Sequence, residues 1–312
     1  MEKNHTKTYF KPSTVTEAVQ IATEHENSFA YVAGGTDLMV NRFQGNNAAG
    51  CLIDISGIGS LKEVYREGDY LHIGALTVLD DLQFHPEITS NFPVLPEAAR
   101  AVASPVLRKS ATVGGNILCE NRCMYYNQSE WWREAVGYCL KCNGNICIAS
   151  GGTKACFSKF VSDMAIALIA LEAKITVLNG TGERTIPLHS IYTGDGVHPR
   201  SLQVQSLITS ILVPVVKQHV VFKKLRKRES VDFSSLTTAV SLKEKGGVKI
   251  VLGGVDPKPV VIEGSGTDDE EDMIQKAVKK ARIVENDSYS RVYRKKMISV
   301  YLKRSFEELR QK

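Results

Sequence analysis

The chain has 312 residues, of which 43% are hydrophobic and 23% are charged, and its formal net charge is +5. This length allows two or three sub-domains with a buried core, while the modest charge excludes the basic surface of a typical nucleic-acid-binding protein. The longest apolar run, near Met164–Leu171, is too short to cross a bilayer, and the polar N-terminus lacks the apolar segment of a signal peptide. We therefore expect a cytoplasmic protein with no nucleic-acid or membrane partner.

The N-terminal region alternates between helix and strand. Capping-box spacing predicts a helix over Thr14–His25, and a buried strand over Phe29–Ala33 leads into Gly34-Gly35-Thr36-Asp37. A helix over Leu38–Phe43 and a strand over Cys51–Ile55 are predicted next. A glycine turn between a strand and a helix can aim backbone N–H groups at an anion, although many such glycine pairs are only turns.

A second glycine pair occurs in Thr112-Val113-Gly114-Gly115-Asn116. Before it we expect a strand over Tyr70–Gly74 and helices over Thr77–Leu82 and Val94–Ala103. Two glycine loops from different sub-domains could hold a diphosphate from both sides, and the pair is more specific than either loop alone.

The pattern changes near Pro214, where a separate α+β unit is expected to begin. Before this point, a helix starting at Asp163 is followed by short strands. Beyond it, long apolar runs predict antiparallel strands and then two helices. The expected elements are helix 163–173, strands 174–178, 184–188, 207–213, 220–225, 236–242 and 248–255, and helices 268–281 and 291–309.

Six of the seven cysteines lie between Cys119 and Cys156, which in a reducing compartment favours metal ligands or redox groups over disulfides. Cys51 lies in an apolar strand and reads as a buried hydrophobe. The spacing of the other six cysteines allows either of two kinds of metal site. Cys119, Cys123, Cys139 and Cys142 have nearly zinc-ribbon spacing, whereas four thiolates from the wider set could hold an iron–sulfur cluster. Reduced cysteines without metal are a third interpretation.

The two tryptophans and three tyrosines between the cysteines are expected to form a small apolar core for this stretch.

The two glycine motifs and Ser162-Asp163 at the start of an apolar helix resemble the FAD-binding medium subunit of the molybdenum hydroxylases, which include xanthine dehydrogenase and carbon monoxide dehydrogenase. Lys224, Arg228 and Asp232-Phe233 resemble the motif that opens the C-terminal domain of that family. The resemblance implies an α+β chain with a two-sub-domain FAD-binding fold shared with vanillyl-alcohol oxidase. The implied divisions are residues 1–57, 58–214 and a C-terminal α+β domain, 215–312.

In most members of this family the second glycine motif runs almost directly into the aspartate, but here an insert of about 119–161 intervenes. This insert resembles the β subunit of 4-hydroxybenzoyl-CoA reductase, whose loop carries an additional [4Fe–4S] cluster. The resemblance selects the iron–sulfur interpretation and leaves Cys119 and Cys142 without a role. The implied cluster ligands are Cys123, Cys139, Cys147 and Cys156.

By the same resemblance, backbone amides of both glycine loops bind the FAD diphosphate, Asp163 contacts the polar chain of the cofactor and Lys224 lies near the flavin ring. No residue is expected to catalyse the substrate chemistry, which would occur on a partner subunit. The implied FAD-binding residues are Val32, Ala33, Gly34, Gly35, Thr36, Asp37, Leu38, Thr112, Gly114, Gly115, Asn116, Asp163 and Lys224.

The resemblance also implies one subunit of three, completed by a small [2Fe–2S] protein and a large molybdopterin protein. We expect an electron-transfer flavoprotein that exchanges electrons with ferredoxin or NAD(H), in a complex that reductively dehydroxylates a phenolic substrate. An alternative is a xanthine-dehydrogenase-like subunit that uses NAD, with the cysteine loop a zinc-stapled docking element. A scaffold that has lost its flavin is a third interpretation, against which the two intact glycine motifs argue.

Overall fold

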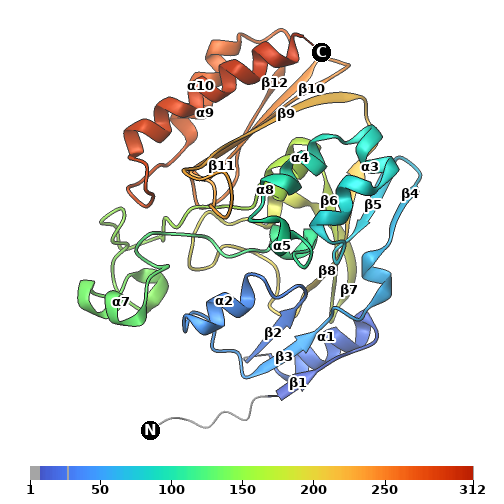
Figure 1. Cartoon of the computed structure of the whole chain (residues 1–312), viewed down its shortest axis with the longest axis vertical. Coiled ribbons are helices and arrows are strands. Elements are labelled where there is room, and N and C mark those ends of the chain that lie inside the picture. Colours follow the sequence, from blue (N-terminus) through green and yellow to red (C-terminus); the bar gives the residue numbers. More distant parts are fainter. Residues whose placement is uncertain (1–7, 27, 312) are drawn as a thin grey trace.

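The computed structural model describes residues 8–26 and 28–311, so residues 1–7 of the expected first sub-domain lie outside it. It confirms the expected mixture of helices and sheets, with three sheets in chain order. Figure 1 shows the N-terminal sheet at the bottom, the largest sheet in the middle and the C-terminal sheet at the top. Among the described residues, the search for a helix that is both long and apolar enough to span a membrane is negative.

The first sheet is wholly parallel, with the order β1 (Thr8–Phe10), β3 (Cys51–Asp54) and β2 (Phe29–Val32). Its helix α1 (Val15–Glu24) begins with a capping box: Thr14 Oγ1 accepts from Glu17 N at 3.2 Å, and Glu17 Oε2 accepts from Ser13 N at 2.8 Å. Helix α2 (Leu38–Phe43) starts directly after the first glycine loop. The predicted order of strand, glycine turn and helix is therefore confirmed.

The second sheet is antiparallel and carries most of the helices. Its strands, in spatial order, are β4 (Val64–Glu67), β5 (Tyr70–Gly74), β8 (Leu207–Pro214), β6 (Lys174–Asn179) and β7 (Gly182–Pro187). Its helices are α3 (Pro86–Asn91), α4 (Val94–Ala101), α5 (Pro105–Arg108), α6 (Val113–Ile117) and α8 (Asp163–Ala170). Helix α8 is buried along its whole length because it packs against α4 on one side and the third sheet on the other. Asp163, the first residue of α8, is thereby held between the helices of the second sheet and the third sheet.

The helix predicted over Thr77–Leu82 is wrong in type and position, because the structure has a 3₁₀ helix over Leu79–Phe84 instead. Val78 pairs with Thr112 in an isolated β-bridge, and Leu79 N donates to Ala111 O at 2.8 Å. These contacts hold the start of the segment extended, which the local apolar spacing could not reveal.

The third sheet is antiparallel in the order β12 (Val260–Ser265), β11 (Gly247–Gly253), β10 (Leu236–Lys243) and β9 (Gln218–Leu225). Helices α9 (Glu270–Lys280) and α10 (Arg291–Leu309) pack against it, as Figure 1 shows, and enclose a separate apolar core. Both helices were predicted, and α10 has the expected bounds.

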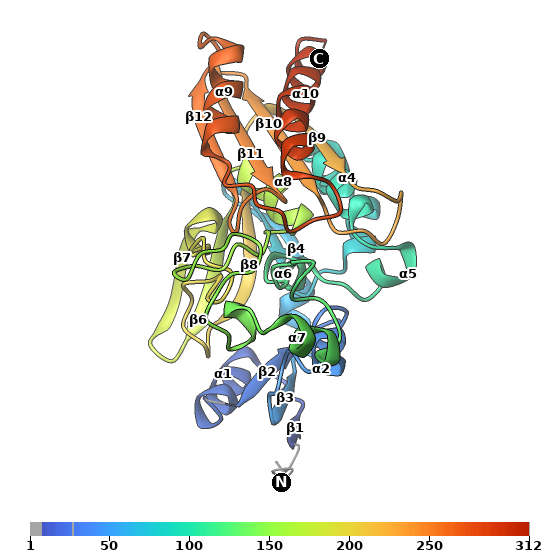
Figure 2. The ribbon, with the colours of Figure 1, turned by 90° about the vertical axis from the view of Figure 1, so that its left-hand side faces the viewer.

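The insert folds mainly as turns around α7 (Glu130–Val136), which lies next to α2 in Figure 2. The buried Arg133 side chain of α7 donates to Asn46 Oδ1 at 2.6 Å and to Gln44 O at 3.3 Å. Tyr126 is buried among the cysteines, but Trp131 is 75% exposed. The expectation that the aromatic residues form a core is therefore wrong for Trp131, because α7 turns Arg133 inward instead, and for the exposed Tyr138.

Candidate functional site

A cavity of about 1250 Å³ lies where the first sheet, the helices of the second sheet, the insert and β9 meet. Drug-sized ligands occupy pockets of roughly 300–1000 Å³, so this cavity can hold a dinucleotide. All the residues predicted to bind FAD line it except Val32, which belongs to β2 itself. The lining residues from that set are Ala33, Gly34, Gly35, Thr36, Asp37, Leu38, Thr112, Gly114, Gly115, Asn116, Asp163 and Lys224.

The first glycine loop lies against the backbone of the chain just before the second loop. A Cβ on Gly34 would lie 1.7 Å from Ser110 O, so glycine is required there by a protein contact. Gly35 has φ +69°, a left-handed conformation that glycine adopts without the steric cost of a Cβ. Both glycines are thus needed to shape this wall of the cavity, whether or not a ligand is bound.

The second glycine loop forms the first turn of the short helix α6. Thr112 caps it, with Oγ1 accepting from Gly115 N at 3.1 Å. A Cβ on Gly114 would lie 2.8 Å from Ala75 O, so this loop also approaches backbone closely. Asn116 Oδ1 accepts from Ser162 Oγ at 2.8 Å and from Met164 N at 3.2 Å, which joins the second loop to the start of α8.

Asp163 and Lys224 meet at the side of the cavity formed by α8 and β9. Lys224 Nζ lies 2.6 Å from Asp163 Oδ2 and donates to Ala101 O at 2.8 Å, while Thr237 donates to Asp163 Oδ1 at 3.1 Å. Burial raises the pKa of Asp163, and the Lys224 ammonium acts in the opposite direction. Asp163, expected at the polar chain of the cofactor, and Lys224, expected near the flavin ring, thus form one buried ion pair.

The first residues of the insert contact the first glycine loop. Arg122 forms an ion pair with Asp37 and lies over the ring of Phe233, 4.4 Å from its centroid. Glu120 N donates to Asp37 Oδ2 at 2.9 Å. Burial lowers the pKa of Arg122 to about 10, so the guanidinium stays charged at neutral pH. The sequence did not reveal this contact, because the paired residues are 85 positions apart.

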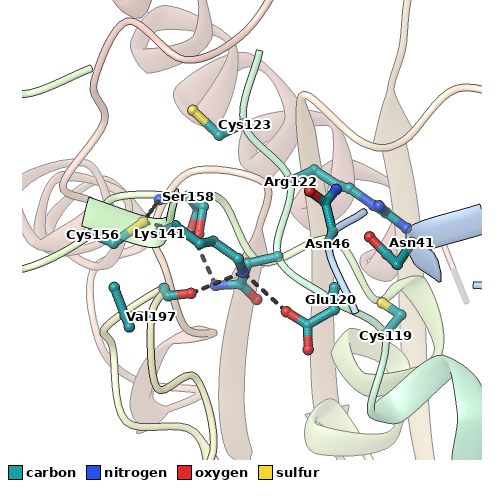
Figure 3. Close-up of polar contacts among 12 residues, drawn as sticks. Asn41, Asn46, Cys119, Glu120, Arg122, Cys123, Lys141, Cys156, Ser158 and Val197 are labelled. Atoms are coloured by element: carbon teal, nitrogen blue, oxygen red, sulfur yellow. Dashed lines mark hydrogen bonds and ion pairs between the residues drawn. The ribbon is translucent and has the colours of Figure 1, made fainter. Parts of the chain in front are cut away.

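Glu120 also forms ion pairs with two cations at the cavity wall. Arg200 forms an ion pair with it, and Lys141 Nζ donates to Glu120 Oε2 at 3.0 Å and to Gly196 O at 2.9 Å, as Figure 3 shows for Lys141. Burial raises the pKa of Glu120, but the two cations hold it below the usual value. These side chains were also missed in the sequence, since no local pattern marks them.

Four residues that line the cavity have a buried polar atom without a hydrogen-bond partner within the described part of the chain: Asn41 Oδ1, Arg122 Nε, Asn127 Nδ2 and Ser206 Oγ. Buried polar groups in proteins are nearly always paired. The unpaired atoms, together with the close glycine walls, fit a ligand with many polar groups such as the polar chain of FAD.

The four predicted cluster ligands are all buried, and three of them begin turns of the insert. Carbonyl oxygens of Cys123, Cys139 and Cys147 each accept two backbone N–H groups from the residues that follow. The neighbouring thiols of Cys147 and Cys156 influence each other, which lowers the pKa of Cys147 and raises that of Cys156. The charges of Cys139 and Cys147 both act on Cys123. Cys123 and Cys139 belong to one small apolar cluster of the insert, together with Tyr126.

Backbone N–H groups point at several of these sulfur atoms. Ser158 N lies 3.4 Å from Cys156 Sγ. Burial raises the pKa of the Cys123 thiol, while the backbone N–H groups of Tyr125 and Tyr126 act to lower it. Such donors stabilise a thiolate, which is the form that binds metal.

Cys119 lies away from this set. In Figure 3 its thiol is beside Glu120 and apart from Cys123 and Cys156. Burial raises its pKa to about 12, and the charged groups acting on it include Arg200, Glu120, Asp163 and Lys224. The four cysteines with zinc-ribbon spacing are therefore not brought together. In residues 8–26 and 28–311, no group of three or more His, Cys, Asp or Glu side chains is placed to hold a metal ion.

The two ends of the insert meet at one point. Arg122 N donates to Lys159 O at 3.0 Å, and Lys159 N donates to Arg122 O at 2.8 Å. Asn121 Nδ2 adds a bond to Ser158 O at 3.0 Å. The insert therefore leaves and rejoins the rest of the fold at the same place, beside the wall of the cavity.

A cavity walled by two glycine loops from different sheets, with unpaired polar atoms facing it, defines a dinucleotide-binding flavoprotein of the two-part type. Residues 3–216 match the model of the FAD-binding domain in molybdopterin dehydrogenase. The chain belongs to this family, and FAD is its cofactor.

Among curated relatives, the aldehyde oxidoreductase FAD-binding subunit of Escherichia coli (strain K12) is 31% identical over 269 residues, covering 83% of this chain and 84% of the relative. The carbon monoxide dehydrogenase medium chain of Hydrogenophaga pseudoflava is 27% identical over 262 residues, covering 82% of this chain and 77% of the relative. These relatives are FAD subunits or medium chains of oxidoreductases, and this chain is an oxidoreductase subunit of the same kind.

Solved structures show the same fold over nearly the whole chain. Carbon monoxide dehydrogenase from Hydrogenophaga pseudoflava superposes with a TM-score of 0.74 at 23% identity, covering 97% of this chain and 96% of the other. Quinoline 2-oxidoreductase from Pseudomonas putida 86 gives 0.72 at 18% identity, with the same coverage. At these identities the superpositions support the fold alone.

Proposed function

We propose that this chain is the electron-transfer flavoprotein subunit of a molybdenum enzyme, and that its insert holds a [4Fe–4S] cluster. The observation that carries the flavin part is the single cavity lined by both glycine loops, Asp163 and Lys224. When bound, FAD accepts two electrons together and releases them singly. The residues of this chain bind and orient it.

The diphosphate is proposed to lie between the two glycine loops, with backbone N–H groups as donors. Asp37 at the end of the first loop would repel the phosphates, and its ion pair with Arg122 removes that repulsion. Asn41 Oδ1 and Ser206 Oγ are available for the polar chain, because both face the cavity without partners among the described residues. The buried pair of Asp163 and Lys224 would lie on the flavin side.

The cluster is supported by the burial of the four cysteines, their mutual contacts and the N–H groups directed at their sulfur atoms. A cubane takes one thiolate at each of four irons, so its ligands stand further apart than those of a single ion. The proposed ligands are Cys123, Cys139, Cys147 and Cys156. Cys142 would remain a free thiol beside them.

The proposed complex follows the relatives, which are FAD subunits or medium chains by name. We propose that a small [2Fe–2S] subunit and a large molybdopterin subunit complete it, and that ferredoxin or NAD(H) is the external partner. A cytoplasmic location and reductive dehydroxylation of a phenolic substrate on the molybdenum subunit belong to the same proposal. The proposed phenolic substrate is supported only by the resemblance of the insert.

The test is metal and flavin analysis of the anaerobically purified chain. We expect FAD, iron and acid-labile sulfide, with flavin absorption bands above a broad iron–sulfur shoulder. Cys139→Ser should remove the iron and sulfide and keep the FAD. Cys142→Ser, on the same turn, is the matched control and should keep all three. Stoichiometric zinc without iron would contradict the cluster, and a chain without FAD would contradict the flavoprotein.

A further inference from the structure

Arg294, near the start of α10, is a fully buried cation whose guanidinium contacts only neutral groups. It donates to Gly254 O and Asn286 Oδ1, each at 3.0 Å, and to Val284 O. Its exposed fraction is 0%, and its Nε has no hydrogen-bond partner within the described residues. Arg294 takes part in none of the ion pairs among the described residues. A buried charge without a counter-charge is strongly unfavourable, so its presence needs an explanation.

The hydrogen bonds of Asn286 connect Arg294 to the cysteines of the insert. Met124 N, next to Cys123, donates to Asn286 O at 3.3 Å. Asn286 Nδ2 donates to Phe157 O, next to Cys156, at 2.6 Å. One buried residue therefore joins the guanidinium to the backbone beside two of the four proposed ligands, through its side chain beside Cys156 and through its backbone carbonyl beside Cys123.

The other charges at this junction largely compensate one another. Lys159 forms an ion pair with Asp287, and both side chains are at least nine-tenths buried. Burial lowers the pKa of Arg294, and the charges of Asp287, Glu285 and Cys123 act to raise it. Asp287 is already paired to Lys159, and Glu285 is exposed to solvent, so neither carboxylate balances the buried guanidinium within the junction.

An anionic group on the insert side would supply the missing counter-charge. A cubane held by four thiolates is net negative, and it gains a further negative charge when it takes up one electron. A nearby buried cation stabilises the reduced form more than the oxidised form, because the attraction grows with the negative charge.

We propose that Arg294 is the counter-charge of an anionic iron–sulfur group on the insert, and that it raises the reduction potential of that group. This inference rests on the proposed cluster. Arg294 is a positioning and tuning residue, since it acts through charge and through Asn286 without touching a sulfur atom.

The test compares cluster potentials in the full chain by redox titration, with the reduced cluster followed by electron paramagnetic resonance. Arg294→Gln removes the charge and should lower the midpoint potential by about 59 mV, which is a tenfold change for a one-electron couple. Arg294→Lys keeps the charge and should stay close to wild type. Arg310→Gln is the matched control: it also removes one positive charge, but from an exposed ion pair with Glu270 beyond the far end of α10.

A second variant keeps the inference open to refutation if Arg294→Gln loses the cluster. Asn286→Asp places a carboxylate against the guanidinium and should lower the potential in the same direction. An iron-loaded Arg294→Gln or Asn286→Asp chain with the wild-type potential would overturn the inference while leaving the cluster in place. A wild-type chain without iron would instead overturn the proposed function, and the inference with it.

Discussion

Replacing Gly34 with alanine is expected to weaken both folding and FAD binding, because the first glycine loop presses against the chain before the second. The new Cβ would lie 1.7 Å from Ser110 O and 2.5 Å from its carbonyl carbon. Backbone atoms cannot rotate away as a flexible side chain can, so the two segments must separate by more than about 1 Å. Overpacking of this kind lowers the free energy of unfolding by about 1–3 kcal/mol. A comparable loss in binding weakens FAD affinity about tenfold for each 1.4 kcal/mol.

The assay is thermal unfolding of the flavin-free chain, together with FAD content per chain after purification. Gly59→Ala is the control, because a Cβ there meets no atom within 4 Å, and its effect should stay within about 0.5 kcal/mol. An unchanged unfolding midpoint for flavin-free Gly34→Ala would refute the reasoning. That result would mean that the glycine serves only the cofactor.

Three further outcomes follow from the ion pairs of the cavity. Arg122→Met leaves Asp37 unpaired beside the diphosphate and should weaken FAD binding by about ten- to a hundredfold in equilibrium dialysis, while normal affinity would show that the pair is incidental. Asp163→Asn leaves the buried Lys224 ammonium without its carboxylate and should lower the free energy of unfolding by about 3–5 kcal/mol in denaturant titrations, with the added change Lys224→Met restoring part of the loss. The folded-state pKa of Glu120 lies below its ordinary value, so its stabilising effect is present above about pH 4.5 and is lost as the pH falls through the folded pKa. Glu120→Gln should therefore flatten the dependence of stability on pH below about 4.5, and an unaltered curve would contradict this assignment.

Structural features that depend on a short stretch of sequence were predicted well. The glycine loops, the capped start of α8 at Ser162 and the bounds of α10 all depend on neighbouring residues, and each appears where the pattern indicated. The short helices α5 and α6 were missed because four or five residues carry too little apolar periodicity.

Contacts between distant residues could not be predicted. Arg122 pairs with Asp37, and Arg200 pairs with Glu120, across 85 and 80 positions. No spacing rule relates such residues, because their meeting depends on how three sheets pack. The same limit applies to Cys119, which Figure 3 shows apart from Cys123 and Cys156 in the folded chain although it is close to Cys123 in the sequence.

The paired backbone of Arg122 and Lys159 brings the two ends of residues 123–158 together. Two antiparallel positions that already exchange hydrogen bonds can be joined by a two-residue Asn-Gly turn, so removal of residues 123–158 leaves a backbone that can close at this point. Closing a flexible loop costs free energy that grows only slowly with its length, so a short turn and a long excursion at this point differ little in the entropy of closure. A shortened chain of this kind should keep its flavin spectrum while losing any iron. The paired positions thus mark where this flavoprotein fold can gain or lose an inserted segment in a single genetic event.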